Sequence, residues 1–146
     1  MSGKTRILLK LTGEILKPAA DGSISSNLLI KIAHQIKELS QAYTFGIVVG
    51  GGNFFRGNVQ GKALGISSSV GHQIGMLATM MNGLIVKDLF GQNGIPSTLF
   101  CAVPTPEVGV PISDQSINAA LQKNHCLIFT GGTGNPFFTT DTTSVL

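Results

Sequence analysis

Short runs of apolar residues alternate along the chain with stretches in which apolar residues recur every three or four positions. The runs at residues 6–11, 45–49, 98–102 and 126–130 predict buried strands, because each is short, continuous and followed by a turn signal. Helical spacing predicts helices at residues 28–39, 72–90 and 114–123, the last of them capped by Ser113. This alternation indicates an α/β fold, a three-layer sandwich with helices on both faces of a mostly parallel sheet.

The predicted helix at 72–90 carries a long stripe of large apolar residues. We expect this stripe to face the sheet and its methionine to pack in the core. It consists of Ile74, Leu77, Met81, Leu84 and Leu89.

Length and composition predict one compact domain spanning residues 1–146. The chain is 42% hydrophobic with a mean hydropathy of +0.31, which supplies ample apolar surface for a core. Charged residues make up only 12% of the chain, too few for a disordered segment or a polybasic tail. The net charge of +3 is a weak indication of an anionic ligand. Because Lys and Arg are scattered, no nucleic-acid partner is expected.

The cysteines, the histidines and the N-terminus exclude several classes of protein. Cys101 and Cys126 lie in apolar strands without a C-x-x-C pair, so we expect reduced core residues. His34, His72 and His125 have no metal-ligand spacing, so no metal site is predicted in the chain. No apolar signal core follows Met1, and no apolar run approaches the length of a membrane span. We therefore expect a cytoplasmic protein without a membrane partner.

Three of the four predicted strands end in loops rich in glycine, threonine and basic residues. Ligands of open parallel sheets bind outside the carboxyl ends of the strands, so these loops should converge. Their amides, hydroxyls and cations donate hydrogen bonds to phosphate oxygens without adding negative charge. The candidates are Lys10, Thr12 and Gly13 in the first loop, Gly50, Gly51, Gly52, Asn53 and Arg56 in the second, and Thr133, Gly134, Asn135, Thr139 and Thr140 in the third.

Familiar phosphate-binding motifs do not fit the sequence. Gly57 and Gly61 are one residue too close for a P-loop, and Ala63 stands where the magnesium-binding hydroxyl belongs. The segment at 132–137 lacks the third glycine of a dinucleotide-binding fingerprint. There is also no G-x-S-x-G elbow of a serine hydrolase.

Four segments together resemble the successive signature blocks of bacterial uridylate kinases, members of the amino acid kinase family. In chain order they read ILLKLTGE at residues 7–14, VVGGGNFFRG at 48–57, GMLATMMNG at 75–83 and GTGNPFFTTD at 132–141. The resemblance runs from Arg6 to the last residue. Members of the family continue past Leu146, so the resemblance covers the front part of the fold and leaves out the C-terminal part.

The resemblance implies transfer of the γ-phosphoryl group of ATP, bound with Mg²⁺, to UMP, giving UDP for pyrimidine nucleotide biosynthesis. Lys10 and Arg56 would be the catalytic cations, because they would neutralise charge on the phosphoryl oxygens. The ATP-binding residues implied in this chain are Lys10, Leu11, Thr12, Gly13, Gly52 and Arg56.

The resemblance places UMP mainly on the third loop. The UMP-binding residues implied are Gly51, His72, Thr133, Gly134, Asn135, Pro136, Phe137, Phe138, Thr139 and Thr140. Simpler interpretations remain for several of them. Phe137 and Phe138 are of a type that packs in cores more often than it stacks on a base, and Thr139 or Thr140 could cap a helix. By the same reasoning, Lys10 could be a solvated strand end and Gly50–Gly52 an ordinary tight turn.

Two positions depart from the family pattern. His72 stands after Gly71 where an acidic residue usually helps to hold UMP, and a histidine is not an anionic acceptor. Ser68 stands where an arginine is usual.

The sequence therefore predicts a UMP kinase, with two alternatives kept open. One is another enzyme of the same fold, such as a carbamate or amino acid kinase. The other is a non-catalytic nucleotide-binding or assembly subunit, because the adenine pocket of the family follows later than residue 146. The resemblance also implies a homohexamer, and it leaves open whether UTP or GTP regulates the protein.

Overall fold

The computed structural model describes residues 3–16, 26–135 and 144–145 of the chain. Its strands are β1 (Thr5–Leu11), β2 (Tyr43–Val49), β3 (Ser97–Cys101), β4 (Val110–Pro111) and β5 (Cys126–Thr130). Its α-helices are α1 (Asn27–Leu39), α2 (Ser68–Gln92) and α3 (Asp114–Gln122). A 3-10 helix at Gly13–Leu16 and a π-helical turn at Gly57–Gly61 complete the described elements. The strands and helices predicted from the apolar pattern are all present, whereas β4 and the two short helical turns were not predicted.

The strands form one parallel sheet in the order β1-β2-β5-β3-β4. β1 and β2 pair along their whole length, from Thr5 opposite Tyr43 to Leu11 opposite Val49. β5 lies between β2 and β3 and pairs with both of them. The carboxyl ends of β1, β2 and β5 are therefore neighbours at one edge of the sheet, where the three predicted ligand loops begin.

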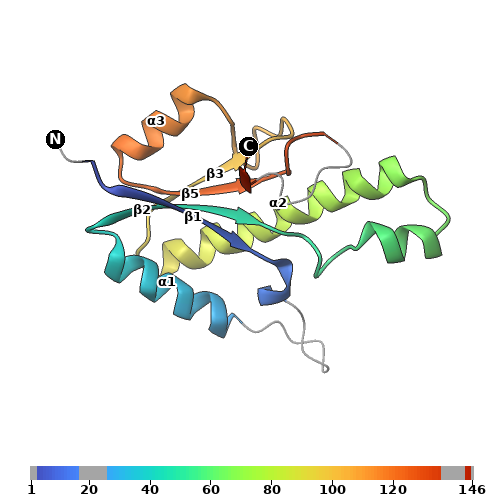
Figure 1. Ribbon diagram of the computed structural model, residues 1–146, viewed down its shortest axis with the longest axis horizontal. Coiled ribbons are helices and arrows are strands. Elements are labelled where there is room, and N and C mark those ends of the chain that lie inside the picture. The colour runs from blue at the N-terminus through green and yellow to red at the C-terminus, as the bar shows by residue number, and fades with distance from the viewer. Residues whose placement is uncertain (1–2, 17–25, 136–143, 146) are drawn as a thin grey trace.

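Helices cover both faces of the sheet, as Figure 1 shows. The main core lies on the face of α1 and α2, where Leu29 and Phe90 from these helices pack with Ile47 and Ile128 from the strands. A smaller cluster on the other face joins α3 to the sheet through Ala120 and neighbouring apolar residues. This arrangement confirms the predicted α/β sandwich with a parallel sheet.

The prediction of which side of α2 faces the sheet is wrong for most of the expected stripe, although Leu89 packs against the main core and Met80 is buried in it. Leu77, Met81 and Leu84 of the expected stripe are 53%, 49% and 43% exposed. The buried residues of α2 are instead Gly71, Ala78, Thr79, Met80, Asn82, Gly83, Val86 and Phe90. Five of these eight residues are small or polar, because parts of the helix lie too close to the sheet and its loops for large side chains.

α2 is also long and apolar enough to cross a membrane, judged by its length and mean hydropathy alone. The expectation that no apolar run approaches the length of a span is wrong on that count, since α2 has 25 residues and a window with a mean hydropathy of 1.2. Within that window 39% of the residues are buried inside the fold. α2 thus contributes to the core of this domain.

Two local predictions are confirmed. Ser113 caps α3, because its side chain accepts a hydrogen bond from the Ser116 amide while the Ser116 hydroxyl accepts one from the Ser113 amide. Cys101 and Cys126 are free, buried thiols. Burial raises the pKa of Cys126 to about 12, so this thiol stays neutral in the core.

Candidate functional site

The loops after β1 and β2 are packed backbone against backbone. The Gly50 amide donates a hydrogen bond to the Leu11 carbonyl over 2.8 Å. A Cβ added to Gly13 would lie 2.8 Å from the Gly52 nitrogen, and the Asn53 side chain would be closer still. Only glycine fits at position 13, because the two loops lie so close together there. The structure therefore brings together the first two of the loops that the sequence predicted to converge.

Arg56 lies beside this junction and is held by several groups. Its guanidinium forms an ion pair with Glu14, and its Nε donates to the Gly52 carbonyl over 3.2 Å. Its backbone amide donates to Oε1 of Gln60 over 2.5 Å. The Arg56 side chain nevertheless remains 57% exposed, so it is accessible to a ligand.

A cavity of about 320 Å³ opens between these groups. It is lined by Glu14, Gly52, Asn53, Arg56, Val59 and Gln60. Sequence reasoning missed Glu14, because a carboxylate is not expected beside a candidate phosphate site. In the structure its role is visible: it anchors the guanidinium whose outer face can bind an anion.

The loop after β5 depends on glycine as well. Gly131, Gly132 and Gly134 have φ values of +81°, +60° and +78°, a region that other residues rarely adopt. The Gly134 amide bonds the Gly131 carbonyl over 3.0 Å, and the Asn135 amide bonds the Thr133 hydroxyl over 3.3 Å. The loop therefore forms a compact turn built of backbone amides, the kind of structure that binds anions.

This third loop borders a larger hollow of about 750 Å³. The hollow has a mostly apolar lining that includes Val48, Phe129 and Ile117, and its polar rim includes Thr133 and Asn135. Its volume is in the range of small-molecule sites. The remaining residues predicted for UMP in this loop, Pro136, Phe137, Phe138, Thr139 and Thr140, lie outside the described residues.

The other predicted residues lie around these loops. Lys10 is exposed next to the end of β1, opposite Val48, and Thr12 is exposed directly after the strand. Leu11 is half-buried and packs on the main core, as its place on the other face of β1 requires. His72 is half-buried in the second turn of α2, and its neighbour Gly71 lies against Gly57, next to Arg56.

α2 joins the second and third loops. Gly51 is so close to this helix that an added Cβ would lie 2.8 Å from Cβ of Ala78. Asn82 donates to the Gly50 carbonyl, and the Thr79 hydroxyl accepts from the Gly131 amide. Sequence reasoning assigned this helix to core packing and missed both polar residues. The available signal was the presence of Thr79 and Asn82, three positions apart, within an otherwise apolar stretch.

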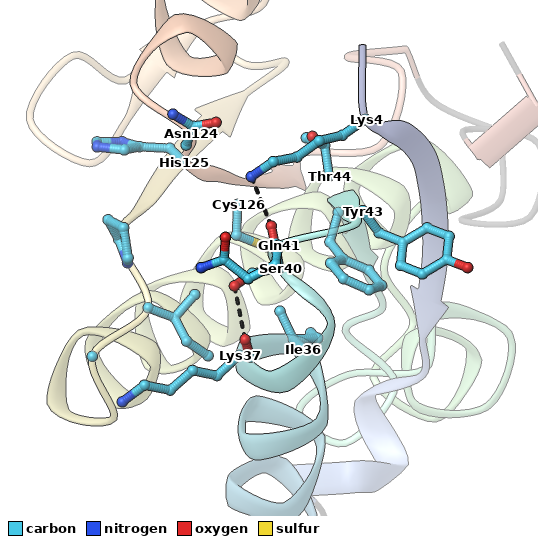
Figure 2. Close-up of a pocket in the computed structure, with 14 residues that line it drawn as sticks. Lys4, Ile36, Lys37, Ser40, Gln41, Tyr43, Thr44, Asn124, His125 and Cys126 are labelled. Carbon is cyan, nitrogen blue, oxygen red and sulfur yellow. Dashed lines mark hydrogen bonds between the residues drawn. The ribbon is translucent and has the colours of Figure 1, made fainter. Parts of the chain in front are cut away.

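A separate cavity of about 330 Å³ lies at the opposite edge of the sheet, near the amino ends of the strands (Figure 2). Its two lysines are engaged with backbone carbonyls: Lys4 donates to Ser40 over 2.7 Å and Lys37 to Asn93 over 3.0 Å. His125 on its rim lies 2.9 Å from the Thr98 hydroxyl. This cavity is remote from the three loops and is not part of the candidate site.

Within the described part of the chain, no three His, Cys, Asp or Glu side chains gather as a metal site would require. Among the described residues that line the two cavities beside the loops, Glu14 is the one carboxylate, and it is paired with Arg56.

Two bacterial proteins named uridylate kinase are similar to this chain in sequence. The uridylate kinase of Mycoplasma genitalium is 39% identical over 144 residues, which are 98% of this chain and 59% of that protein. The uridylate kinase of Sodalis glossinidius is 42% identical over 142 residues, or 97% of this chain and 58% of that protein. The resemblance to uridylate kinases is thus confirmed, and the chain spans about three-fifths of the length of these relatives.

Solved structures agree with the sequence relatives. The crystal structure of UMP kinase from Ureaplasma parvum superposes with a TM-score of 0.90 at 32% identity, covering 97% of this chain and 61% of that one. UMP kinase from Bacillus anthracis gives a TM-score of 0.87 at 31% identity, covering 98% and 59%. Residues 5–146 of this chain match the sequence pattern of the amino acid kinase family. With its parallel sheet, its three glycine-rich loops at one edge of that sheet and this match over nearly its full length, the chain belongs to the amino acid kinase family.

Proposed function

We propose that this chain forms the acceptor-binding and phosphate-binding portion of a UMP kinase, which transfers the γ-phosphoryl group of ATP to UMP. The observation that carries the proposal is the packing of the loop after β1 against the loop after β2, at the edge of the sheet where the loop after β5 also begins. Together these loops place backbone amides, a guanidinium and hydroxyls along one edge of the sheet. The names of the relatives supply the substrate class.

Each loop would have a distinct part in the reaction. Lys10 and Arg56 would lower the negative charge on the oxygens of the transferred group, and the Gly50–Gly52 turn would let the phosphates approach the backbone. The Gly131–Asn135 turn, with Thr139 and Thr140 after it, would hold the UMP phosphate through amides and hydroxyls. Such transfer needs no covalent intermediate, because it depends on aligning acceptor and donor.

Magnesium would arrive with ATP, whose phosphates are its principal ligands, and would screen their charge. The contribution of this chain would be to position the acceptor and the phosphates through its loops. The adenine pocket would be supplied by chain equivalent to the remaining two-fifths of the relatives. From the family resemblance of the sequence, we also propose a cytoplasmic, homohexameric enzyme of pyrimidine nucleotide synthesis, with UTP or GTP as candidate effectors.

Two measurements test the proposal. Isothermal titration calorimetry of the 146-residue chain should detect weak binding of UMP, and weaker binding of uridine and AMP. A chimera that continues the chain with the remaining part of the Mycoplasma genitalium relative should release ADP in a coupled assay with ATP and UMP, well ahead of CMP, carbamate or N-acetylglutamate. Faster turnover with carbamate or an amino acid would overturn the UMP assignment and leave the fold intact.

A non-catalytic nucleotide-binding subunit is the second candidate, favoured by His72. A histidine there cannot serve as an anionic acceptor for ribose hydroxyls. If the chimera is inactive and becomes active on His72→Asp, the binding-subunit function is the correct one. If the chimera is active with His72 in place, that candidate is excluded.

A further inference from the structure

Thr79 lies where α2 meets the third loop, and it is only 7% exposed. Its hydroxyl donates to the Met76 carbonyl over 2.7 Å, one turn back in the helix. The same oxygen accepts a hydrogen bond from the buried Gly131 amide over 2.7 Å. β5 ends at Thr130, so the sheet pairing stops just before this amide. A buried amide without a partner is costly, and Thr79 supplies the partner.

Asn82 has the corresponding position toward the second loop and is fully buried. Its Nδ2 donates to the Gly50 carbonyl over 2.6 Å and to Oδ1 of Asn53 over 2.7 Å. Its Oδ1 accepts from Nδ2 of Asn53 over 3.1 Å. Both amide hydrogens and one acceptor are therefore used within one turn of chain, at Gly50–Asn53.

The two polar residues are three positions apart, so they lie on the same face of α2. Close packing leaves this face little freedom to move. A Cβ on Gly83 would lie 2.8 Å from Cδ1 of Leu99, with Cγ2 of Thr130 closer still, and a Cβ on Gly51 would lie 2.9 Å from the Thr79 nitrogen. One rigid helix thus contacts both loops directly.

We infer that Thr79 and Asn82 are positioning residues, which set the orientation of the Gly131–Asn135 loop and of the Gly50–Asn53 turn relative to each other. The inference rests on the proposed function, because these two loops are the ones that would align UMP with the transferred phosphate. Each residue acts through a backbone group of a loop. Precise alignment matters for transfer, since a misplacement of about 1 Å can cost on the order of 100-fold in rate.

The test compares variants of the 146-residue chain labelled with ¹⁵N. Thr79→Val keeps the shape of the side chain and removes the acceptor, whereas Thr79→Ser keeps the acceptor. Asn82→Leu removes the bonds to the turn. Met80→Leu, a volume-conserving change at a neighbouring buried position, is the matched control. For each variant, amide hydrogen exchange and chemical shifts are recorded, and UMP and ATP are titrated.

Thr79→Val should speed hydrogen exchange of the Gly131 amide by about 10-fold and weaken the binding of UMP by about 3- to 10-fold. Both changes are the effect of one lost hydrogen bond, which is worth about 1 kcal/mol. ATP binding and the Gly50–Asn53 signals should hardly change. Asn82→Leu should instead speed exchange in the Gly50–Asn53 turn and leave exchange of the Gly131 amide unchanged, and Thr79→Ser and Met80→Leu should resemble the parent. A general loss of stability would not divide the effects between the loops in this way.

The inference is overturned if Thr79→Ser behaves like Thr79→Val, or if either substitution disturbs both loops equally. It is also overturned if Gly131 loses protection while UMP affinity stays the same. If the parent chain binds neither UMP nor ATP, the proposed function fails, but the exchange pattern at the two loops still decides the inference. Should Asn82→Leu not fold, the Thr79 pair decides alone.

Discussion

Replacing Gly83 by alanine tests how closely α2 lies on the sheet. In an open helical position this change stabilises a protein, by up to about 1 kcal/mol. At Gly83, however, the new Cβ would lie 2.8 Å from Cδ1 of Leu99 and closer to Cγ2 of Thr130. Carbon atoms in contact normally lie about 3.5–4.0 Å apart, and overpacking of this kind costs about 1–3 kcal/mol. We therefore expect a net loss of about 1–2 kcal/mol in the free energy of unfolding.

Urea unfolding followed by circular dichroism measures this loss as a lower midpoint at an unchanged slope. Gly75→Ala is the matched control on the same helix, because no atom lies within 4 Å of its added Cβ, and it should stabilise the chain. Thr130→Ser removes the crowding methyl group and keeps the hydroxyl, which donates to the Phe100 carbonyl over 2.9 Å. Combined with Gly83→Ala, it should recover part of the loss. If Gly83→Ala is as stabilising as Gly75→Ala, the close approach of α2 is refuted.

Three further predictions concern charge, ionisation and association. Arg56→Ala should weaken the binding of UMP by about 1.5–3 kcal/mol in calorimetry and leave the binding of uridine unchanged, because a charge-assisted contact to phosphate is lost. The control Arg6→Ala should change the binding of neither ligand. If Arg56→Ala and the parent chain bind UMP with equal affinity, Arg56 lies outside the site. Burial raises the pKa of Cys126 from 9.0 to about 12, so the unfolded thiol ionises first and the free energy of unfolding should fall as the pH rises from about 9 to 12. Cys126→Ala should lessen that fall in urea titrations at each pH, and identical slopes would contradict the assignment. The double substitution Leu77→Gln and Met81→Gln should reduce self-association, measured as particle mass by light scattering, without lowering the free energy of unfolding. The reason is that both side chains are about half exposed. An unchanged particle mass would show that this stripe is not an association surface.

The strands could be predicted well from the sequence because each is a continuous apolar run ended by a turn. β5 matches its predicted residues, and β1, β2 and β3 begin and end within two residues of prediction. β4 could not be predicted, since it has only two residues, and its pairing with β3 depends on tertiary structure. Convergence of the loops followed from the parallel topology, because the carboxyl ends of parallel strands share one edge.

The face of α2 could not be read from its pattern. The spacing of large apolar residues pointed to Leu77 and Met81, yet contact with a sheet and two loops at close range favours small residues such as Ala78 and Gly83. The pairing of Glu14 with Arg56 was hidden for a related reason, because these residues are far apart in sequence and meet only when the loops pack. Sequence reasoning could place candidate residues at the strand ends, but it could not show which partners hold them.

The position of β5 also determines the order in which this sheet can be completed. β5 is the last of the described strands to leave the ribosome, but it belongs in the middle of the sheet, between β2 and β3. Until it is made, no strand can join β2 to β3, so the pairing edges of these two strands lack their partner. Closing the sheet then requires contacts between residues such as Gly46 and Leu127, which are distant in sequence, and such contacts slow folding. The same late strand carries the Gly131–Asn135 loop, so the loop proposed to hold UMP can take its place only when the sheet closes.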